Sequence, residues 1–261
     1  MRASETKTAQ ESISRAMEEA FEIDAKGLGY RELNKTLRSL DRKHVENVRI
    51  INAEGQRYIG THLSNIRKIE IYGTPGNDLG CFMSGPSITV HGNVQDGCGN
   101  TMSNGAIIVH GSAGDILGYA IRGGKIFVRG DAGYRTGIHM KEYRNYRPLI
   151  VIGGTAGDFL GEYMAGGILI VLGLDLPQNQ HRAKYVGAGM HGGVMYIHGG
   201  IRHMGKEAEI RELDSSDRQI LDPILKEFST YFPVDFELLS GRDYYKIRSR
   251  STRPYGNLYA Y

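Results

Sequence analysis

A short segment of alternating aliphatic residues that runs into a glycine recurs seven times in this chain, and it constrains the fold more than any other feature. The segments begin at Ile69, Ile88, Ile107, Ile126, Leu149, Leu169 and Met195. The first four starts lie 19 residues apart, and the later spacings of 23, 20 and 26 residues are the same period with insertions. Because the first and third positions are always aliphatic or Met, each segment is predicted to be a β-strand with one buried face.

Glycine makes up 36 of the 261 residues, about twice the usual proportion. Several repeats continue as G-x-x-G-x-x-x-G after the strand. A unit of this length is too short for a strand and a crossover helix, but it fits one coil of a parallel β-helix with glycine at its corners. The predicted corner glycines are Gly73, Gly76, Gly80, Gly92, Gly99, Gly111, Gly114, Gly118, Gly130, Gly133, Gly137, Gly153, Gly157, Gly161, Gly173 and Gly199. We therefore expect an all-β fold, a single-stranded right-handed parallel β-helix of about seven coils.

A second column, five residues before the next repeat, is rich in methionine. Its members are Met83, Met102, Ile121, Met164 and Met190, and Met140 occupies the matching place before the four-residue insertion. Met fills irregular gaps in protein cores well. We interpret the column as core packing and not as a cofactor or metal site.

The flanks divide the chain into an N-terminal helical segment (1–47), the β-helix (48–206) and a C-terminal helix with a basic, Tyr-rich tail (207–261). Thr8 and Glu11 have capping-box spacing, which predicts a first helix that runs through Phe21. Residues 33–40 mark a second helix. In the C-terminal part, Asp222 and Pro223 suit a helix start. Helices at both ends are expected to cap the column, because an open solenoid exposes sheet edges.

Two glycine motifs resemble nucleotide-binding loops. Residues 187–192 match G-x-G-x-x-G but lead into a predicted strand instead of a helix. Residues 200–207 fall one residue short of a P-loop, and Glu207 replaces the hydroxyl residue that holds Mg²⁺. We interpret both motifs as structural.

Stacked polar side chains are the other candidates for chemistry. His91 and His110 occupy equivalent places in adjacent coils, but no third metal ligand accompanies them. Cys81 and Cys98 lack C-x-x-C spacing, and two thiols cannot hold an iron–sulfur cluster alone. We expect an ordinary polar ladder and structural thiols, with no metal or cofactor site on this chain.

Aspartates recur in one corner column, at Asp96, Asp115 and Asp158. Aspartate caps turns through its own backbone, and this interpretation is favoured over Ca²⁺ ligation. Asp115 and Asp158 beside Arg122 or Arg135 are also the only hint of an independent β-helix enzyme that acts on a polysaccharide.

Apolar residues at outward strand positions indicate that something covers the later coils. The chain's own terminal helices and a partner subunit are the two alternatives. Arg and Tyr are enriched at protein interfaces. The predicted interface residues are Ile150, Ile152, Ile170, Leu172, Arg144, Arg147, Arg253 and Tyr255.

The net charge of +3 is low for a nucleic-acid-binding protein. No apolar run approaches the roughly 18 residues of a membrane span, and residues 1–15 lack the apolar core of a signal peptide. We expect a cytoplasmic protein that binds neither nucleic acid nor membranes.

The glycine coils, the preceding stretch from Gly29 to Asn34 and the ending from Arg253 to Tyr261 together resemble the C-terminal β-helix domain of the glutamate synthase large subunit, in its free-standing form. A related β-helix occurs in one subunit of formylmethanofuran dehydrogenase. The likeness to glutamate synthase covers about residues 25–261 and is ranked first because of the flanking helix and the tail.

The resemblance implies a non-catalytic subunit that holds other subunits in register for ammonia transfer. The implied partners are a glutaminase subunit with an N-terminal cysteine and a synthase subunit with FMN and an iron–sulfur cluster. This chain has no cysteine before Cys81, so it lacks that nucleophile. The β-helix subunit of formylmethanofuran dehydrogenase, the polysaccharide enzyme and a self-associating structural protein remain alternatives.

Overall fold

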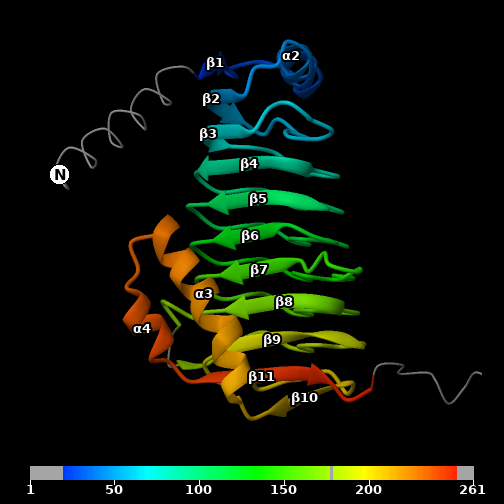
Figure 1. Ribbon diagram of the computed structural model, residues 1–261, viewed down its shortest axis with the longest axis vertical. Coiled ribbons are helices and arrows are strands. Elements are labelled where there is room, and N and C mark those ends of the chain that lie inside the picture. The colour runs from blue at the N-terminus through cyan, green and yellow to red at the C-terminus, as the bar shows by residue number, and fades with distance from the viewer. Residues whose placement is uncertain (1–19, 177–178, 252–261) are drawn as a thin grey trace, which may run out of the picture.

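The computed structural model describes residues 20–176 and 179–251. The chain winds into a column, and its strands stack into one sheet along the length of that column (Figure 1). The strands are β1 (Phe21–Asp24), β2 (Asn47–Glu54), β3 (Lys68–Thr74), β4 (Ser84–His91), β5 (Asn104–Val109), β6 (Lys125–Val128), β7 (Leu149–Ile152), β8 (Ala165–Val171), β9 (Gly192–His198), β10 (Ala208–Arg211) and β11 (Tyr244–Ser249). The helices are α2 (Tyr30–Arg42), α3 (Ser215–Tyr231) and α4 (Phe236–Ser240).

Strands β1 to β9 follow one another in parallel pairing, and β3 to β9 are the seven predicted repeats. The parallel β-helix is therefore confirmed. A second face of the column consists of single parallel bridges that join Val94, Ala113, Ala132 and Ala156 in successive coils. The repeat forms a coil because each short strand can bury its apolar side only against the coils above and below it.

The interior of the column is lined by the inward residues of every strand and by the predicted methionine column. All five members of that column and Met140 are fully buried in the main core. The interpretation as core packing is confirmed.

The register of the fifth repeat differs from the prediction by one residue. Ile126 pairs with Ile150 and Leu149 pairs with Lys125, so this repeat begins at Ile150. The insertion before it is one residue longer than predicted. Because side chains alternate along a strand, a slip of one residue reverses every inward and outward assignment. Ile150 and Ile152 accordingly face the interior and do not lie on an accessible surface, whereas Leu149 and Val151 face outward.

The N-terminal flank contains the second predicted helix, and Phe21, through which the first was predicted to run, lies in a strand. Residues Phe21–Asp24 form β1, which pairs in parallel with β2. The proposed capping box at Thr8 and Glu11 lies outside the described residues. Helix α2 places Leu33, Leu37 and Leu40 against the main core and covers the first end of the column.

The C-terminal flank differs more from the prediction. Helix α3 begins after Asp214, whose side chain accepts hydrogen bonds from the backbone of Ser216 and Asp217, and Asp217 completes a capping box. Pro223 lies inside the helix and not in its first turn. The predicted basic tail begins with a strand, β11, that pairs antiparallel with β9 and β10.

Helix α3 lies along the side of the column and does not cap its end (Figure 1). Its Leu221, Leu225 and Phe228 pack on the outward side chains of the sheet. The far end of the column is instead closed by residues from the last loop and strands, including Met204, Ala208 and Ile247.

Candidate interface surfaces and polar ladders

The corner aspartates bind the backbone of the next coil. Asp96 Oδ1 accepts a hydrogen bond from the Asp115 backbone N–H, and Asp115 Oδ1 accepts one from Tyr134, each at 2.8 Å. Asp158 makes the same contact with Lys184 at 2.8 Å. The sequence predicted that each aspartate caps its own turn, whereas each of these carboxylates binds the backbone of the next coil and so joins two coils.

Of the two arginines predicted beside these aspartates, Arg135 has structural contacts. Arg135 pairs with Glu162 at 2.9 Å and stacks over Phe159. In the parts of the chain that the structure describes, no group of three or more His, Cys, Asp or Glu side chains is placed to hold a metal ion.

Corner glycines allow adjacent coils to approach closely. At Gly92, an added Cβ would overlap the carbonyl oxygen of Gly73 in the preceding coil. In the fifth repeat this ladder position is occupied by Gly154, not by the predicted Gly153. The Gly154 N–H donates to Gly130 O at 2.9 Å, and Gly173 N–H donates to Gly154 O at 3.1 Å. This correction follows from the one-residue change in register.

On the third face of the column, each turn has left-handed backbone at three positions that are two residues apart. The middle position is the last glycine of the G-x-x-G-x-x-x-G motif, as in Asp78, Gly80 and Phe82. Bulky residues take flanking positions, among them Phe82 at φ 54° and Tyr163 at φ 51°. Such residues cost about 1–3 kcal/mol each in this conformation. Their side chains are 52% and 44% exposed, and this aromatic surface was not among the predicted sites. The signal that could have found it is an aromatic residue two positions after Gly80 and Gly161.

Both cysteines are buried free thiols. Burial raises the pKa of Cys81 to about 11, together with the nearby Asp78 charge, and burial alone raises the pKa of Cys98 to about 12. A thiol that stays protonated is a poor nucleophile and metal ligand. Structural packing is the role that this environment supports.

The two histidines belong to a stack of rings on the outside of the column. Tyr72 stacks on His91 with ring centroids 4.3 Å apart, and His91 stacks on His110 at 5.0 Å. His110 then meets Phe232 edge-on at 5.3 Å. Burial and the neighbouring His91 lower the pKa of His110. The stack ends in a contact with the chain just after α3.

A partly buried ionic cluster fastens the start of α3 to strands β9 and β11. Lys246 Nζ lies 2.7 Å from Asp217 Oδ2 and 3.2 Å from Asp214 Oδ2. The Tyr196 hydroxyl donates to Asp217 Oδ1 at 2.6 Å. Burial favours the neutral form of Asp217, but the bonds from Lys246 and Tyr196 outweigh it and hold the pKa below its ordinary value. The pKa of Asp214 falls to about 2 because Ser216 and Lys246 donate to it.

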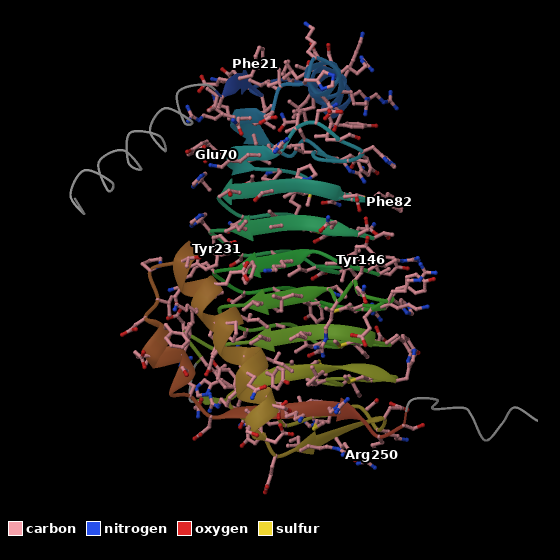
Figure 2. All side chains as sticks on the ribbon, viewed as in Figure 1. Phe21, Glu70, Phe82, Tyr146, Tyr231 and Arg250 are labelled. Atoms are coloured by element: carbon pink, nitrogen blue, oxygen red, sulfur yellow. The ribbon has the colours of Figure 1, made fainter. Side chains whose placement is uncertain are left out.

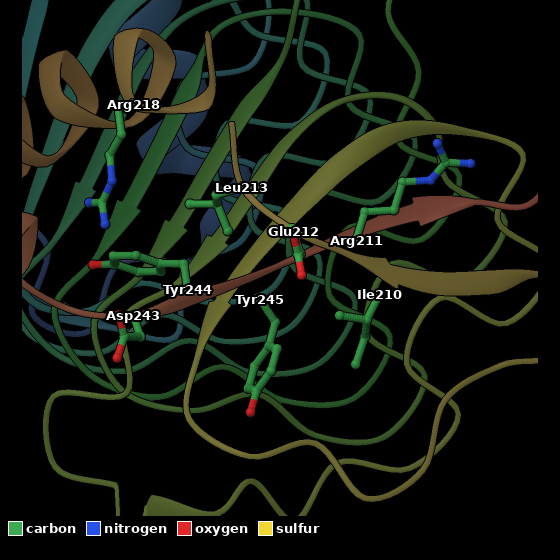
Figure 3. Close-up of a pocket in the computed structure, with 8 residues that line it drawn as sticks. All are labelled: Ile210, Arg211, Glu212, Leu213, Arg218, Asp243, Tyr244 and Tyr245. Carbon is green, nitrogen blue, oxygen red and sulfur yellow. The ribbon is translucent and has the colours of Figure 1, made fainter. Parts of the chain in front are cut away.

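A pocket of about 390 Å³ lies beside this ionic cluster, at the end of the column (Figure 3). It is lined by Ile210, Arg211, Glu212, Leu213, Arg218, Asp243, Tyr244 and Tyr245. Figure 3 shows Arg218 descending from α3 toward Tyr244. The Arg218 guanidinium donates to the carbonyl oxygens of Ser240 and Arg242 at 2.7 and 3.3 Å. Its charge therefore joins α3 to the chain around α4.

The outward apolar face is covered by this chain itself. Ile170 and Leu172 face outward as predicted, but they are fully buried in the cluster that α3 forms with the sheet. Of the two predicted alternatives, the terminal helix is the one that the structure shows. These two residues are therefore not part of an accessible interface.

The insertion before β7 forms a small hairpin on the surface. Tyr143 and Tyr146 exchange two backbone hydrogen bonds of 3.0 Å, and their side chains are 58% and 57% exposed. The Arg144 guanidinium lies 5.1 Å from the Tyr143 ring centroid, and Arg147 pairs with Glu142 at 3.4 Å. Figure 2 shows Phe82 and Tyr146 on the opposite side of the column from Glu70 and Tyr231. The exposed arginines and tyrosines make this side suitable for protein contacts.

The remaining predicted interface residues, Arg253 and Tyr255, lie outside the described residues.

The two motifs that resemble nucleotide-binding loops lack the helix that such a loop opens. The 187–192 segment turns into β9, and the 200–207 segment precedes β10, so neither opens a helix. No helix in the described part of the chain is long and apolar enough to cross a membrane.

Comparison with known protein families shows to which family the chain belongs. The family model of the GXGXG motif matches residues 15–237. The chain belongs to the GXGXG motif family. An uncharacterized protein of Methanocaldococcus jannaschii, MJ1350, is 46% identical over 260 residues, which cover 94% of this chain and 98% of that protein.

A solved structure shares the fold. It is a chain of the formyltransferase/hydrolase complex FhcABCD from Methylorubrum extorquens, determined in complex with methylofuran. The TM-score is 0.61 with 24% identity, and the match covers 76% of this chain and 72% of that one. This match supports the predicted parallel β-helix at the level of the fold.

Proposed function

We propose that this member of the GXGXG family is a non-catalytic structural subunit of a multi-chain enzyme. The proposal rests on the observation that polar side chains, including the aspartates singled out in the sequence, hold the fold together. The corner aspartates bind the backbone between coils, and the ionic cluster fastens the start of α3 to strands β9 and β11. The exposed side chains that remain, on the hairpin and the turns, are rich in Tyr and Arg, which is the composition of binding surfaces.

The enzyme that we propose for this subunit is of the glutamate synthase type. The column would hold a glutaminase subunit and a subunit with FMN and an iron–sulfur cluster in register for ammonia transfer. The resemblance of the glycine coils, the stretch before them and the C-terminal ending supports this choice. The family match to residues 15–237 is compatible with it.

A second candidate is a subunit of a formyl-transferring complex. The fold shared with a chain of the FhcABCD complex favours it. Both candidates assign the same structural role to this chain, and they differ in the proteins that bind to it.

Affinity purification from the source organism tests the proposal and separates the candidates. The tagged full chain is expected to retain a glutaminase and a flavin and iron–sulfur subunit. Recovery of formyltransferase or hydrolase subunits would select the second candidate. Recovery of the chain alone, as a monomer, would contradict both.

Reconstitution provides the functional test. Glutamate formation from glutamine and 2-oxoglutarate should depend on adding this chain to its purified partners. The chain alone should release no ammonia from glutamine, and such release would contradict the structural role. The partners without this chain, each assayed for its own half-reaction, are the control.

A further inference from the structure

The hairpin before β7 is the wall of a second cavity, of about 280 Å³. Its lining consists of Ser84, Ser103, Asn104, Arg122, Tyr143 and Tyr146. The residues come from three successive coils and the inserted hairpin, so the cavity exists only because of the insertion. None of these lining residues belongs to the apolar cluster that α3 covers.

The hairpin is held rigidly over the coils. Its two reciprocal backbone bonds fix Tyr143 and Tyr146 relative to each other. Glu142 anchors the hairpin to the next coil, because its Oε2 accepts the Gly167 backbone N–H at 3.1 Å. Gly123 lies directly below, where an added Cβ would come within 3.4 Å of the Tyr146 Cβ. The cavity wall is therefore fixed before any ligand arrives, which lowers the entropy cost of binding.

Every side chain that lines the cavity can donate a hydrogen bond, and the lining contains no carboxylate. Arg122 is exposed and forms no ion pair with a carboxylate in the described parts of the chain. The side chains of Ser84, Asn104, Tyr143 and Tyr146 likewise have no hydrogen-bond partner among the described residues. The Ser103 hydroxyl already donates to Met83 O at 3.4 Å. The other donors face no carboxylate in the lining and are complementary to the oxygens of an anion.

The charge of the surrounding surface has the same sign. Lys141 and Arg144 lie on the exposed hairpin, and the one carboxylate of the hairpin, Glu142, is paired with Arg147. A local excess of positive charge attracts anions toward the site.

We propose that this cavity binds a small oxyanion, a carboxylate or a phosphate, through Arg122 and the surrounding hydroxyl and amide donors. The guanidinium binds two oxygens of such a group side by side. The Tyr143 and Tyr146 hydroxyls donate to the same group from the hairpin side. This proposal does not depend on the identity of any partner subunit.

Calorimetric titration of the full chain with inorganic phosphate, acetate and glutarate tests the site, at constant ionic strength set with sodium chloride. At least one of these anions is expected to bind saturably at one site. Arg122→Gln should weaken that binding about tenfold or more, as expected for loss of a charge-assisted pair. Tyr146→Phe, which removes only a hydroxyl, should weaken it by a smaller factor.

Arg38→Gln is the matched control, because it removes the same charge from an exposed position on α2 at the end of the column. Binding by phosphate alone or by the carboxylates alone would support the proposal and identify the class of anion. Absence of saturable binding by all three probes would overturn it. Equal weakening by Arg38→Gln and Arg122→Gln would also overturn it, since only the net charge would then matter.

Discussion

Glycine in this chain meets two physical demands that look the same in the sequence. At Gly118 the backbone is left-handed, with φ at 65°, a conformation that glycine adopts without steric cost. Gly92 does not have a left-handed backbone. It must be glycine because the Gly73 carbonyl oxygen of the neighbouring coil occupies the place where a Cβ would lie. The repeat predicts both positions but cannot tell the two demands apart.

Gly92→Ala should destabilise the protein by about 1–3 kcal/mol, the usual cost of forcing extra atoms into a packed site. The cost arises because the obstructing atom belongs to the backbone and can move only with its coil. Urea unfolding followed by circular dichroism measures the change. Gly29→Ala is the control, since an added Cβ there meets no atom within 4 Å. An unchanged stability of the Gly92 variant would show that the coils can separate freely.

At the scale of the helix, α3 shows how tertiary packing outweighs local signals. Pro223 in the middle of a helix removes a hydrogen bond and costs about 3 kcal/mol. Its neighbours Leu221, Leu225 and Phe228 are fully buried on the sheet, and their burial offsets that cost. The sequence favours a helix start at Asp222 because proline is common in the first turn, whereas the capping box at Asp214 starts the helix earlier.

Removing the Phe228 ring should expose the outward face of the sheet. Phe228→Ala is expected to lower the free energy of unfolding by about 3–5 kcal/mol, since it deletes a fully buried aromatic side chain. Lys226→Ala, on the exposed side of the same helix, should change it by less than about 0.5 kcal/mol. Thermal and urea unfolding measure both. Similar small effects in the two variants would mean that α3 is not docked in solution.

The ionic cluster under α3 should make its attachment sensitive to acid. The folded-state pKa of Asp217 is lowered, so its ionised form contributes stability above the ordinary aspartate value of about 3.9. That contribution is lost as the pH falls through the lowered folded-state pKa. Burial disfavours the charged form of Lys246, but its bonds to Asp217 and Asp214 outweigh burial and raise its pKa. The contribution of Lys246 is therefore lost only as the pH rises through that raised value.

Asp217→Asn should therefore cost about 1.5–3 kcal/mol at neutral pH, the range for hydrogen bonds to charged groups. The variant should also lose less stability than the natural protein between about pH 5 and pH 2. Unfolding curves across this range provide the measurement. Asp175→Asn, at a carboxylate that is 83% exposed, is the control. Parallel pH profiles for Asp217→Asn and the natural chain would rule out the cluster as the origin of the acid sensitivity.

For the whole molecule, the arrangement of surfaces matters more than any single contact. One side of the sheet is covered by α3, while the hairpin and the turns leave their arginine and aromatic side chains exposed. A rigid column with one covered side and one accessible side is suited to hold partners at fixed positions along its length.

Arg144→Glu should weaken binding of the partner subunits about tenfold while leaving the unfolding curve unchanged. The side chain is exposed on the hairpin and contacts Tyr143, so reversing its charge alters complementarity and not packing. Surface plasmon resonance with the copurified partner measures the effect. Arg67→Glu, at a side chain that is 77% exposed near the start of β3, is the control. Unchanged affinity of the hairpin variant would exclude Arg144 from the interface.

The sequence by itself determined the parallel β-helix and its inward columns, because each depends on a pattern repeated in every coil. A repeated pattern averages out local ambiguity, and a single copy does not. This is why the fifth repeat, which follows an insertion and consists of Leu149, Ile150, Val151 and Ile152, lies one residue from its predicted register. Four consecutive aliphatic residues carry no alternation from which a face can be assigned.

Only the tertiary structure decided what covers the sheet, how the C-terminal strands close the column and where the hairpin builds a cavity. The pairing of β11 with β9 crosses a long stretch of sequence. The cavity at Arg122 joins residues of three coils and one insertion. Contacts of this kind depend on the position of whole elements in space, and no local preference of the chain encodes them.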